Sequence, residues 1–189
     1  MMEIGIDIGG TKILLIAKNE EIAQRYQCCT GANFAPADAE SIIANFIQIL
    51  PQRPTSIGIA VPGLVDLSGR VIACDVLPQL EGWLPSASID EICPIRTIND
   101  AEAALAKTIN GLDPAATTVV IMVGTGIGAS CYVNGQVLRG ARGWAGELGS
   151  IPVSTANGIV TLDRLASGAA ILQRCWERDD LSIGKDIGE

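Results

Sequence analysis

A carboxylate, two glycines, a hydroxyl and a lysine stand together between two β-rich runs, residues 4–8 and 13–17. The residues are Asp7, Gly9, Gly10, Thr11 and Lys12. Paired glycines permit positive φ and let a ligand approach backbone N–H groups without a Cβ in the way. The hydroxyl and the lysine can bind phosphate, and the carboxylate can face a magnesium ion through water. The stretch predicts a phosphate-binding loop, with an ordinary hairpin turn as the alternative.

A second glycine turn, GTGIGA, occupies residues 124–129. It satisfies the dinucleotide fingerprint G-x-G-x-x-A, which requires a helix directly after the glycines. Here the sequence continues instead as a strand into an Asn-Gly hairpin signal. We therefore expect a strand–turn–strand loop in which Thr125 makes a second phosphate contact, and a plain tight hairpin is the alternative.

The chain contains no histidine, which excludes His-based acid–base catalysis, a Ser-His-Asp triad and His-containing metal sites. Any chemistry must use carboxylates, amides, hydroxyls and a few cations. Asn99 and Asp100 stand where a predicted strand becomes a helix. A carboxylate at a helix start is kept ionised by the helix dipole, which makes Asp100 the predicted general base. The alternative is that either residue serves only as a helix N-cap.

Glu147 lies in the glycine-rich stretch GWAGELG, where no helical or capping duty explains a carboxylate. Binding of sugar hydroxyls is one interpretation of this residue. The other is a solvated glutamate in a loop.

Composition narrows the class of protein further. A net charge of −8 with no basic stripe argues against direct nucleic-acid binding, which depends on clustered Lys and Arg. The longest apolar runs, such as residues 119–123, are too short to cross a membrane, and no basic signal sequence opens the chain, so we expect a cytoplasmic protein. Six cysteines without a CxxC pair predict reduced thiols that are mostly buried.

Hydrophobic periodicity and turn residues predict an α/β protein. The order strand, glycine turn, strand occurs twice, which indicates a coarse internal repeat. The expected elements are strands at 4–8, 13–17 and 22–29, a helix at 37–50, a strand at 56–63, a small hairpin and loop within 64–83, a strand at 93–100, a helix at 101–110, strands and a hairpin within 116–140, and a helix at about 162–178.

Together these motifs resemble the ROK (repressor, open reading frame, kinase) family of sugar kinases and sugar-responsive regulators. The markers are DIGGTK at 7–12, AVPGLVD at 60–66, INDAEAALAK at 98–107, VGTGIGAS at 123–130, AGELGS at 145–150 and LASG at 165–168. The resemblance implies the actin-like ATPase fold. We expect a ribonuclease-H-like first lobe at 1–110, with the first phosphate loop and sugar-binding residues, and a partial, truncated second lobe at 111–189 with the second phosphate loop.

The resemblance also implies an activity, transfer of the ATP γ-phosphoryl group to a hydroxyl of a hexose or N-acetylhexosamine. Asp100 would accept the proton of that hydroxyl, and Asn99, Glu147 and Gly63 would bind the sugar together with it. Mg²⁺ would be faced by Asp7 through water. The ATP phosphates would be held by the two glycine loops, Gly9, Gly10, Thr11 and Lys12 in the first and Gly124, Thr125 and Gly126 in the second. Family analogy suggests a homodimer.

The sequence departs from the family pattern in three ways. Ser150 replaces the histidine that contacts sugar and ligates zinc, and the zinc cysteines in a CxCGxxGC pattern are absent, so we expect no zinc site. Family members also continue well beyond residue 189. The alternatives to a kinase are therefore a noncatalytic sugar sensor, without the DNA-binding module for which the first glycine loop leaves no room, and a truncated remnant.

Overall fold

The computed structural model describes residues 1–21, 23–31, 33–85, 92–141 and 143–177. The chain divides into two compact units, Met1–Ala103 and Ala104–Glu189. The division falls within helix α3 (Asp100–Ile109), ahead of the boundary at residue 110 that the sequence predicts. Residues 22 and 178, which begin and end two of the predicted elements, lie outside the described part of the chain.

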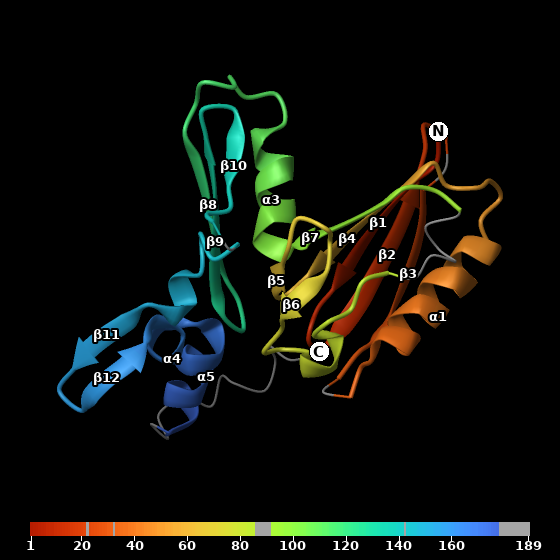
Figure 1. Cartoon of the computed structure of the whole chain (residues 1–189). Coiled ribbons are helices and arrows are strands. Elements are labelled where there is room, and N and C mark those ends of the chain that lie inside the picture. Colours follow the sequence, from red (N-terminus) through yellow and green to blue (C-terminus); the bar gives the residue numbers. More distant parts are fainter. Residues whose placement is uncertain (22, 32, 86–91, 142, 178–189) are drawn as a thin grey trace. The chain divides into compact units, whose positions relative to one another are not determined.

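A five-stranded mixed sheet forms the centre of the first unit, in the order β3-β2-β1-β4-β7 (Figure 1). Strands β1, β2 and β3 form an antiparallel meander, and β4 and β7 join it parallel to β1. The carboxyl ends of β1, β4 and β7 therefore meet at one edge of the sheet, where open α/β sheets usually bind ligands. The bounds are β1 (Glu3–Ile8), β2 (Lys12–Lys18), β3 (Ala23–Cys29), β4 (Ser56–Val61) and β7 (Ile95–Asn99).

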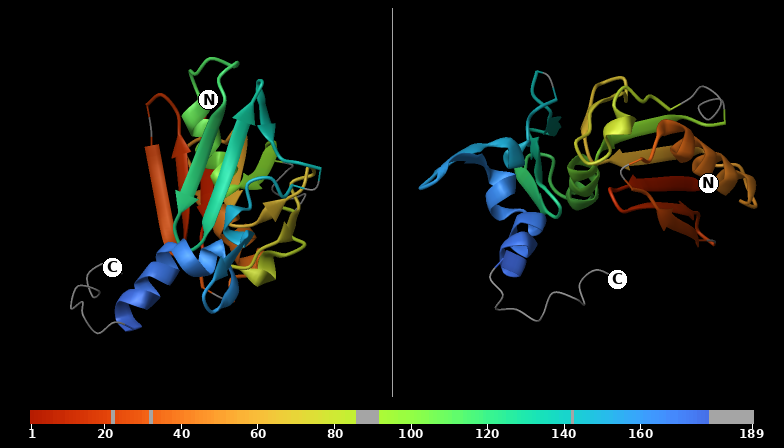
Figure 2. Two further views of the ribbon diagram at one scale, coloured as in Figure 1. Left: turned by 90° about the vertical axis from the view of Figure 1, so that its left-hand side faces the viewer. Right: turned by 90° about the horizontal axis from the view of Figure 1, so that it is seen from below.

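The core of the first unit follows from strict alternation along its strands. In β1, Ile4, Ile6 and Ile8 are buried while the residues between them are exposed. Helix α1 (Pro36–Gln48) covers this face and buries Ile43 against it (Figure 2). Asp7, which alternates with the buried isoleucines, lies on the opposite face of the sheet.

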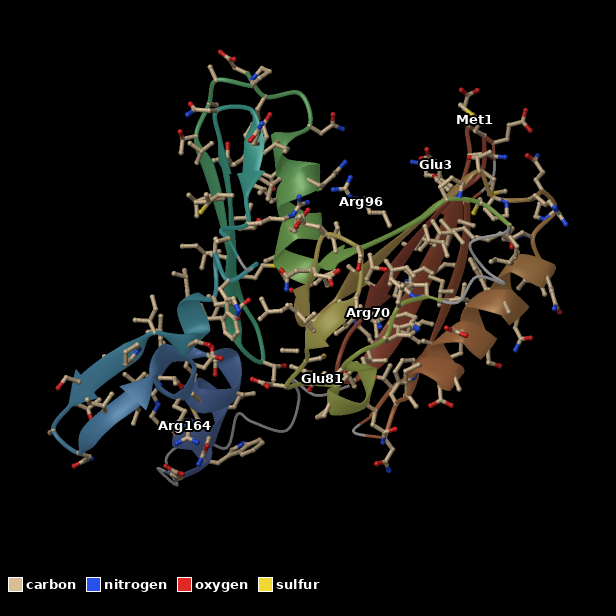
Figure 3. The ribbon with its side chains drawn as sticks, viewed as in Figure 1. Met1, Glu3, Arg70, Glu81, Arg96 and Arg164 are labelled. Atoms are coloured by element: carbon tan, nitrogen blue, oxygen red, sulfur yellow. The ribbon has the colours of Figure 1, made fainter. Side chains whose placement is uncertain are left out.

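Between β4 and β7 the chain forms the predicted small hairpin, β5 (Leu64–Val65) and β6 (Val71–Ala73), followed by a short 3₁₀ turn, η1 (Pro78–Leu80). Arg70, labelled in Figure 3, donates from Nη1 to the carbonyl oxygen of Gly82 at 2.7 Å. The backbone N–H of Val71 donates to the carbonyl of Trp83 at 2.8 Å. These bonds fold residues 64–83 into a compact loop.

In the second unit, the end of α3 is followed by a three-stranded antiparallel meander in the order β10-β9-β8. The strands are β8 (Thr118–Val123), β9 (Ile127–Val133) and β10 (Gln136–Leu138). Asn134 and Gly135 have φ of 50° and 78°, which confirms the predicted Asn-Gly hairpin. The order repeats that of β3-β2-β1, and in both meanders a glycine loop joins the first two strands. The coarse internal repeat in the sequence thus corresponds to a repeat in the structure.

The end of the second unit differs from the prediction. After the 3₁₀ turn η2 (Leu148–Ser150), a hairpin that the sequence did not predict forms from β11 (Pro152–Thr155) and β12 (Gly158–Thr161). The single predicted helix is two helices, α4 (Leu162–Ala166) and α5 (Gly168–Glu177), shown in Figure 1. Ser167 separates them because its backbone is extended, with φ −67° and ψ 159°, and its Oγ accepts a hydrogen bond from the N–H of Ala170 at 3.1 Å.

Two further sequence expectations bear on surface and core. All six cysteines are free thiols, but only Cys74 and Cys93 are buried, so the expectation of mostly buried thiols is wrong.

No helix within the described ranges combines the length and apolarity needed to cross a membrane.

Candidate functional site

The first glycine loop closes the turn between β1 and β2. The N–H of Gly9 donates to the carbonyl of Lys12 at 2.8 Å. Thr30, which follows β3, donates from Oγ1 to the Gly9 carbonyl at 2.7 Å and from its N–H to the Thr11 carbonyl at 3.1 Å. Since Thr30 holds the loop at two carbonyls, the backbone is fixed while the side chains of Thr11 and Lys12 remain exposed. No sequence pattern marked Thr30.

Of the two reasons given for the glycines of this loop, a positive φ and open access of a ligand to the backbone N–H groups, the structure contradicts the first. Neither Gly9 nor Gly10 has a positive φ, so that expectation is wrong. A Cβ on Gly10 would instead lie 2.5 Å from Cγ1 of Val76. A side chain at position 10 would thus force the Val76 side chain, in the loop that follows β6, to move.

Asn99 and Gly63 meet at the carboxyl edge of the sheet. The Asn99 Nδ2 donates to the carbonyl oxygen of Gly63 at 3.0 Å. Its Oδ1 accepts from the N–H groups of Ala101 at 2.8 Å and Glu102 at 3.3 Å, so Asn99 does cap helix α3. Because both ends of the amide are engaged, the Asn99 side chain has one defined orientation.

Asp100 begins α3 immediately after β7 and is half-buried. Burial is the main cause that raises the pKa of its carboxyl, and the charge of Asp7 raises it further, against a hydrogen bond from the N–H of Ala101 at 2.8 Å. Asp7 and Asp100 therefore lie within electrostatic range of each other. A carboxylate that holds its proton more tightly than an ordinary aspartate is a better general base near neutral pH.

Gly63 is held by the β5–β6 hairpin. A Cβ at Gly63 would overlap the carbonyl oxygen of Ala73 and lie 3.1 Å from the Cα of Cys74. The Cys74 thiol donates to the carbonyl of Pro62 at 3.4 Å, and burial raises the pKa of this thiol, so it stays protonated. This hairpin thus fixes the turn that carries Gly63, and the segment after it supplies the Val76 contact to Gly10.

The second glycine loop joins β8 to β9 and is held by one residue of α4 and the first residue of α5. The N–H of Gly124 donates to the carbonyl of Gly126 at 2.9 Å within the loop. The carbonyl of Gly124 accepts from the N–H of Gly168 at 2.7 Å, and Oδ1 of Asp163 accepts from the N–H of Ile127 at 2.6 Å. The strand β9 follows directly, which confirms that this loop is not a dinucleotide-binding turn. Thr125 is exposed at its tip.

Glu147 is half-buried at the start of η2, where its side chain makes no capping hydrogen bond. The turn that carries it is fixed against β9. Gly146 has φ of 101°, its carbonyl accepts from the N–H of Ala129 at 2.8 Å, and a Cβ on it would overlap the Ala129 carbonyl. Glu147 therefore projects from a turn with little freedom to move.

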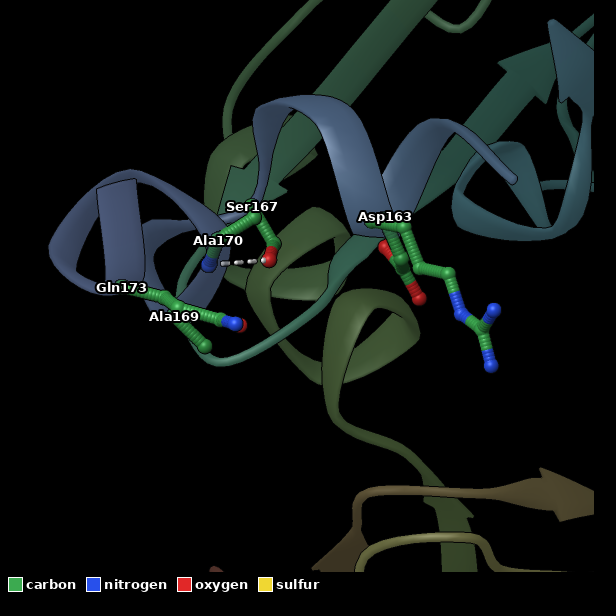
Figure 4. A pocket seen from close by; sticks show the side chains of 6 residues that line it. Asp163, Ser167, Ala169, Ala170 and Gln173 are labelled. Atoms are coloured by element: carbon green, nitrogen blue, oxygen red, sulfur yellow. Dashed lines mark hydrogen bonds between the residues drawn. The ribbon is translucent and has the colours of Figure 1, made fainter. Parts of the chain in front are cut away.

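A surface hollow of about 530 Å³ lies along α4 and α5 (Figure 4). Its wall includes the Asp163 side chain that binds the second glycine loop. The lining residues are Asp163, Arg164, Ser167, Ala169, Ala170 and Gln173. The hollow and the loop that contains Thr125 thus share one residue, Asp163.

The predicted site residues fall into two groups. Asp7, the first glycine loop, Gly63, Asn99 and Asp100 come together at one edge of the first unit, while the second loop and Glu147 belong to the second unit. The stretch in which the family pattern has its zinc cysteines is the β11–β12 hairpin here. Thr155 Oγ1 donates to the carbonyl of Gly158 at 2.7 Å across its turn.

Comparisons with known proteins concern the family and the fold of the chain. The family model described as ROK family matches residues 3–188. The chain is 32% identical over 182 residues to the bifunctional enzyme NanE/NanK of Brucella suis biovar 1, covering 92% of this chain and 34% of that protein. It is 30% identical over 196 residues to the N-acetylmannosamine kinase of Salmonella newport, covering 96% of this chain and 66% of that enzyme.

A solved structure shares the fold. The ROK family glucokinase of Streptomyces griseus, in complex with glucose and AMPPNP, superposes with a TM-score of 0.75 at 24% identity, over 94% of this chain and 61% of that one. The chain thus spans about a third to two thirds of the length of these relatives. It has the α/β, actin-like fold of the ROK proteins and belongs to the ROK family.

Proposed function

We propose that the protein is an ATP-dependent sugar kinase, which transfers the γ-phosphoryl group of ATP to a hydroxyl of a hexose or N-acetylhexosamine. The observation that carries the proposal is the position of Asp100. This carboxyl stands at the carboxyl edge of the parallel strands, beside the first glycine loop, and its pKa is raised by burial and by Asp7. A half-buried acid with a raised pKa at such an edge is a candidate for a general base.

Asp100 would act on the sugar hydroxyl. Its carboxylate accepts the hydroxyl proton as the hydroxyl oxygen forms a bond to the γ-phosphorus. The bond from the γ-phosphorus to the bridging oxygen breaks, and ADP leaves with the electron pair. Catalysis of this type consists mainly of positioning and of stabilising charge on the phosphoryl group, which fits a site without histidine.

Asn99, Gly63 and Glu147 would bind the sugar. Asn99 and Gly63 are already joined by a hydrogen bond of 3.0 Å, so this part of the pocket is organised before a substrate arrives. Glu147 would contribute a carboxylate acceptor from the fixed turn before η2. Carboxylates and amides are suitable partners for sugar hydroxyls because they combine strong acceptors with directed donors.

The two glycine loops would hold the phosphates of ATP. Thr11 and Lys12 add a hydroxyl and a cation in the first loop, and Thr125 adds a hydroxyl in the second. Asp7 would hold a magnesium ion through water, and a cation there suits the residues present because it offsets the repulsion between Asp7 and Asp100. When bound, the ion neutralises part of the phosphate charge.

The names of the relatives narrow the choice of sugars to test. N-acetylmannosamine kinase and glucokinase occur among them, so N-acetylmannosamine and glucose are tested, together with N-acetylglucosamine, the C2 epimer of the first. The test is release of ADP by the purified chain with Mg-ATP, with and without each sugar, together with titration calorimetry of each ligand. Sugar-dependent ADP release supports the proposal and identifies the sugar class.

Two other outcomes of this test contradict the proposed kinase function. Sugar binding without ADP release would favour a noncatalytic sensor. Absence of binding for both sugar and nucleotide would favour a folded remnant.

A further inference from the structure

We infer that Asp163 is a positioning residue that fixes the second phosphate loop against the turn carrying Glu147. This inference rests on the proposed kinase function. Asp163 lies on the short helix α4 and was not marked by the sequence motifs.

The first observation is the bond between Asp163 and the loop. Its Oδ1 accepts the N–H of Ile127, the first residue after the glycines, at 2.6 Å. Hydrogen bonds to a carboxylate are roughly twice as strong as those between neutral groups. A Cβ built on Gly126 would contact Oδ2 of Asp163 at 3.4 Å, so the carboxylate also packs directly beneath the loop.

The second observation is the contact with the other turn. A Cβ built on Gly149, in η2 and two residues after Glu147, would overlap the Asp163 carboxylate. Gly149 is buried, and helix α4 also packs against η2 and β9. One carboxylate thus touches both the proposed phosphate loop and the turn that carries the proposed sugar-binding acid.

The third observation is that the loop is held at both ends by one segment. Gly168 donates its N–H to the carbonyl of Gly124 at 2.7 Å, while Asp163 accepts from Ile127. Ser167 links the two anchors, since its N–H donates to the Asp163 carbonyl at 3.1 Å and its Oγ caps α5. Without the Asp163 bond, α4 and α5 would hold the loop through the Gly168–Gly124 bond alone among the hydrogen bonds of the described residues, and the backbone after the glycines would be less firmly fixed.

The test compares Asp163→Ala and Asp163→Asn with the wild-type chain. Asp163→Ala removes the acceptor and is expected to raise KM and Kd for the nucleotide by about tenfold or more, because misplacing a binding group by a fraction of an ångström is costly. Asp163→Asn keeps the shape and a weaker neutral acceptor, so its effect is expected to be about threefold, between wild type and Asp163→Ala. The Kd of the sugar measured without nucleotide should stay within about twofold, which separates positioning from uniform loss of structure.

Hydrogen exchange supplies a readout that does not depend on turnover. Peptides covering residues 123–128 should exchange faster in Asp163→Ala than in wild type, with Asp163→Asn between them. Asp113→Asn is the matched control, because Asp113 also accepts a backbone N–H, that of Ala115 at 2.9 Å, within a local turn of the same unit. The control should change neither nucleotide affinity nor exchange at 123–128.

Several outcomes overturn the inference. Unchanged nucleotide Kd in both Asp163 variants, unchanged exchange at 123–128, or a wild-type chain that binds no AMPPNP would each do so. Weaker sugar binding in the absence of nucleotide would show that Asp163 contacts sugar directly. If wild type binds AMPPNP but releases no ADP with any sugar, the proposed function fails, while the nucleotide Kd values and exchange rates still decide the role of Asp163.

Discussion

Burial and the neighbouring carboxylate of Asp7 both raise the pKa of Asp100 at the carboxyl edge of the first sheet. Ionisation of Asp100 is thus less favourable in the folded chain than in the unfolded chain. The ionised form of Asp100 therefore lowers the free energy of unfolding. Groups that are selected for function often lower stability in this way. Substitutions of Asp7 and Asp100 should therefore change both stability and activity measurably.

Asp100→Asn is expected to stabilise the fold at neutral pH. The folded-state pKa of Asp100 is raised, so the stability associated with its neutral form is fully present below the unfolded pKa and is lost as pH rises through the folded pKa. The amide keeps the shape and stays neutral, so the variant should melt at a higher temperature than wild type at pH 7. The difference should disappear at pH values below about 3.9, the ordinary aspartate pKa.

Asp66→Asn provides a control of opposite sign for the same thermal melts. A hydrogen bond from Ser68, followed by one from the N–H of Arg70, lowers the pKa of Asp66. Its stabilising contribution is present above the unfolded pKa and is lost as pH falls through the folded pKa. Asp66→Asn should therefore melt at a lower temperature than wild type at pH 7. A lower melting temperature for Asp100→Asn as well would contradict the burial and repulsion assigned to Asp100.

The pH dependence of turnover should also reflect the raised pKa of Asp100. A general base must be ionised, so kcat/KM should fall as pH drops through the raised pKa of Asp100, above the ordinary aspartate value of about 3.9. Asp7→Asn removes the like charge and should move this acid limb to lower pH, whatever its effect on the maximum rate. An acid limb that stays in place in Asp7→Asn would argue against the coupling of the two acids.

Asn99 has two roles, the N-cap of α3 and the hydrogen bond to Gly63, and substitutions can separate them. Asn99→Ser keeps an N-cap oxygen for α3 but is too short to reach the carbonyl of Gly63, so stability should fall only by the worth of that one hydrogen bond, about 0.5–1.5 kcal/mol. Sugar affinity should fall about tenfold, because the amide that would bind a sugar hydroxyl and that orients the Gly63 turn is absent. Calorimetry with the best sugar of the panel measures this.

Asn99→Ala serves as the comparison, since it removes both the cap and the amide. It should lose sugar affinity to the same extent and about 1 kcal/mol of folding stability in addition. Wild-type sugar affinity in both variants would remove Asn99 from the proposed sugar pocket.

Gly63→Ala is expected to destabilise the first unit. Its Cβ would overlap the backbone carbonyl of Ala73, which cannot move aside as a flexible side chain can, so the cost should be about 1–3 kcal/mol. Gly58→Ala in β4 is the matched control, because no atom lies within 4 Å of a Cβ built there. Denaturant unfolding should find the control within about 0.5 kcal/mol of wild type. Equal stabilities for the two variants would show that Gly63 is not closely packed.

Much of the fold was predictable because its signals are local. Alternation of Ile4, Ile6 and Ile8 identifies β1, and Asn134-Gly135 identifies a hairpin from backbone preference alone. The strand-to-helix change at Asp100 likewise placed a carboxylate at a helix start. Each of these inferences needs only a few neighbouring residues.

The remainder depends on contacts between distant residues. Thr30 binds a carbonyl 21 residues away, and Asp163 binds an N–H 36 residues away. The close contact at Gly10 comes from Val76, 66 positions later in the chain, and not from the backbone conformation of Gly10 itself. The break at Ser167 was missed because serine within a helical pattern can either continue the helix or cap a new one, and the packing of Gly168 against Gly124 decides between them.

The most direct test of the central claim is sugar-dependent ADP release by Asp100→Asn beside wild type, with sugar affinity measured on the same samples. If Asp100 is the general base, turnover should fall by at least about 100-fold while the sugar Kd stays within about tenfold of wild type. Turnover equal to wild type in Asp100→Asn would contradict the assignment of Asp100 and with it the proposed mechanism.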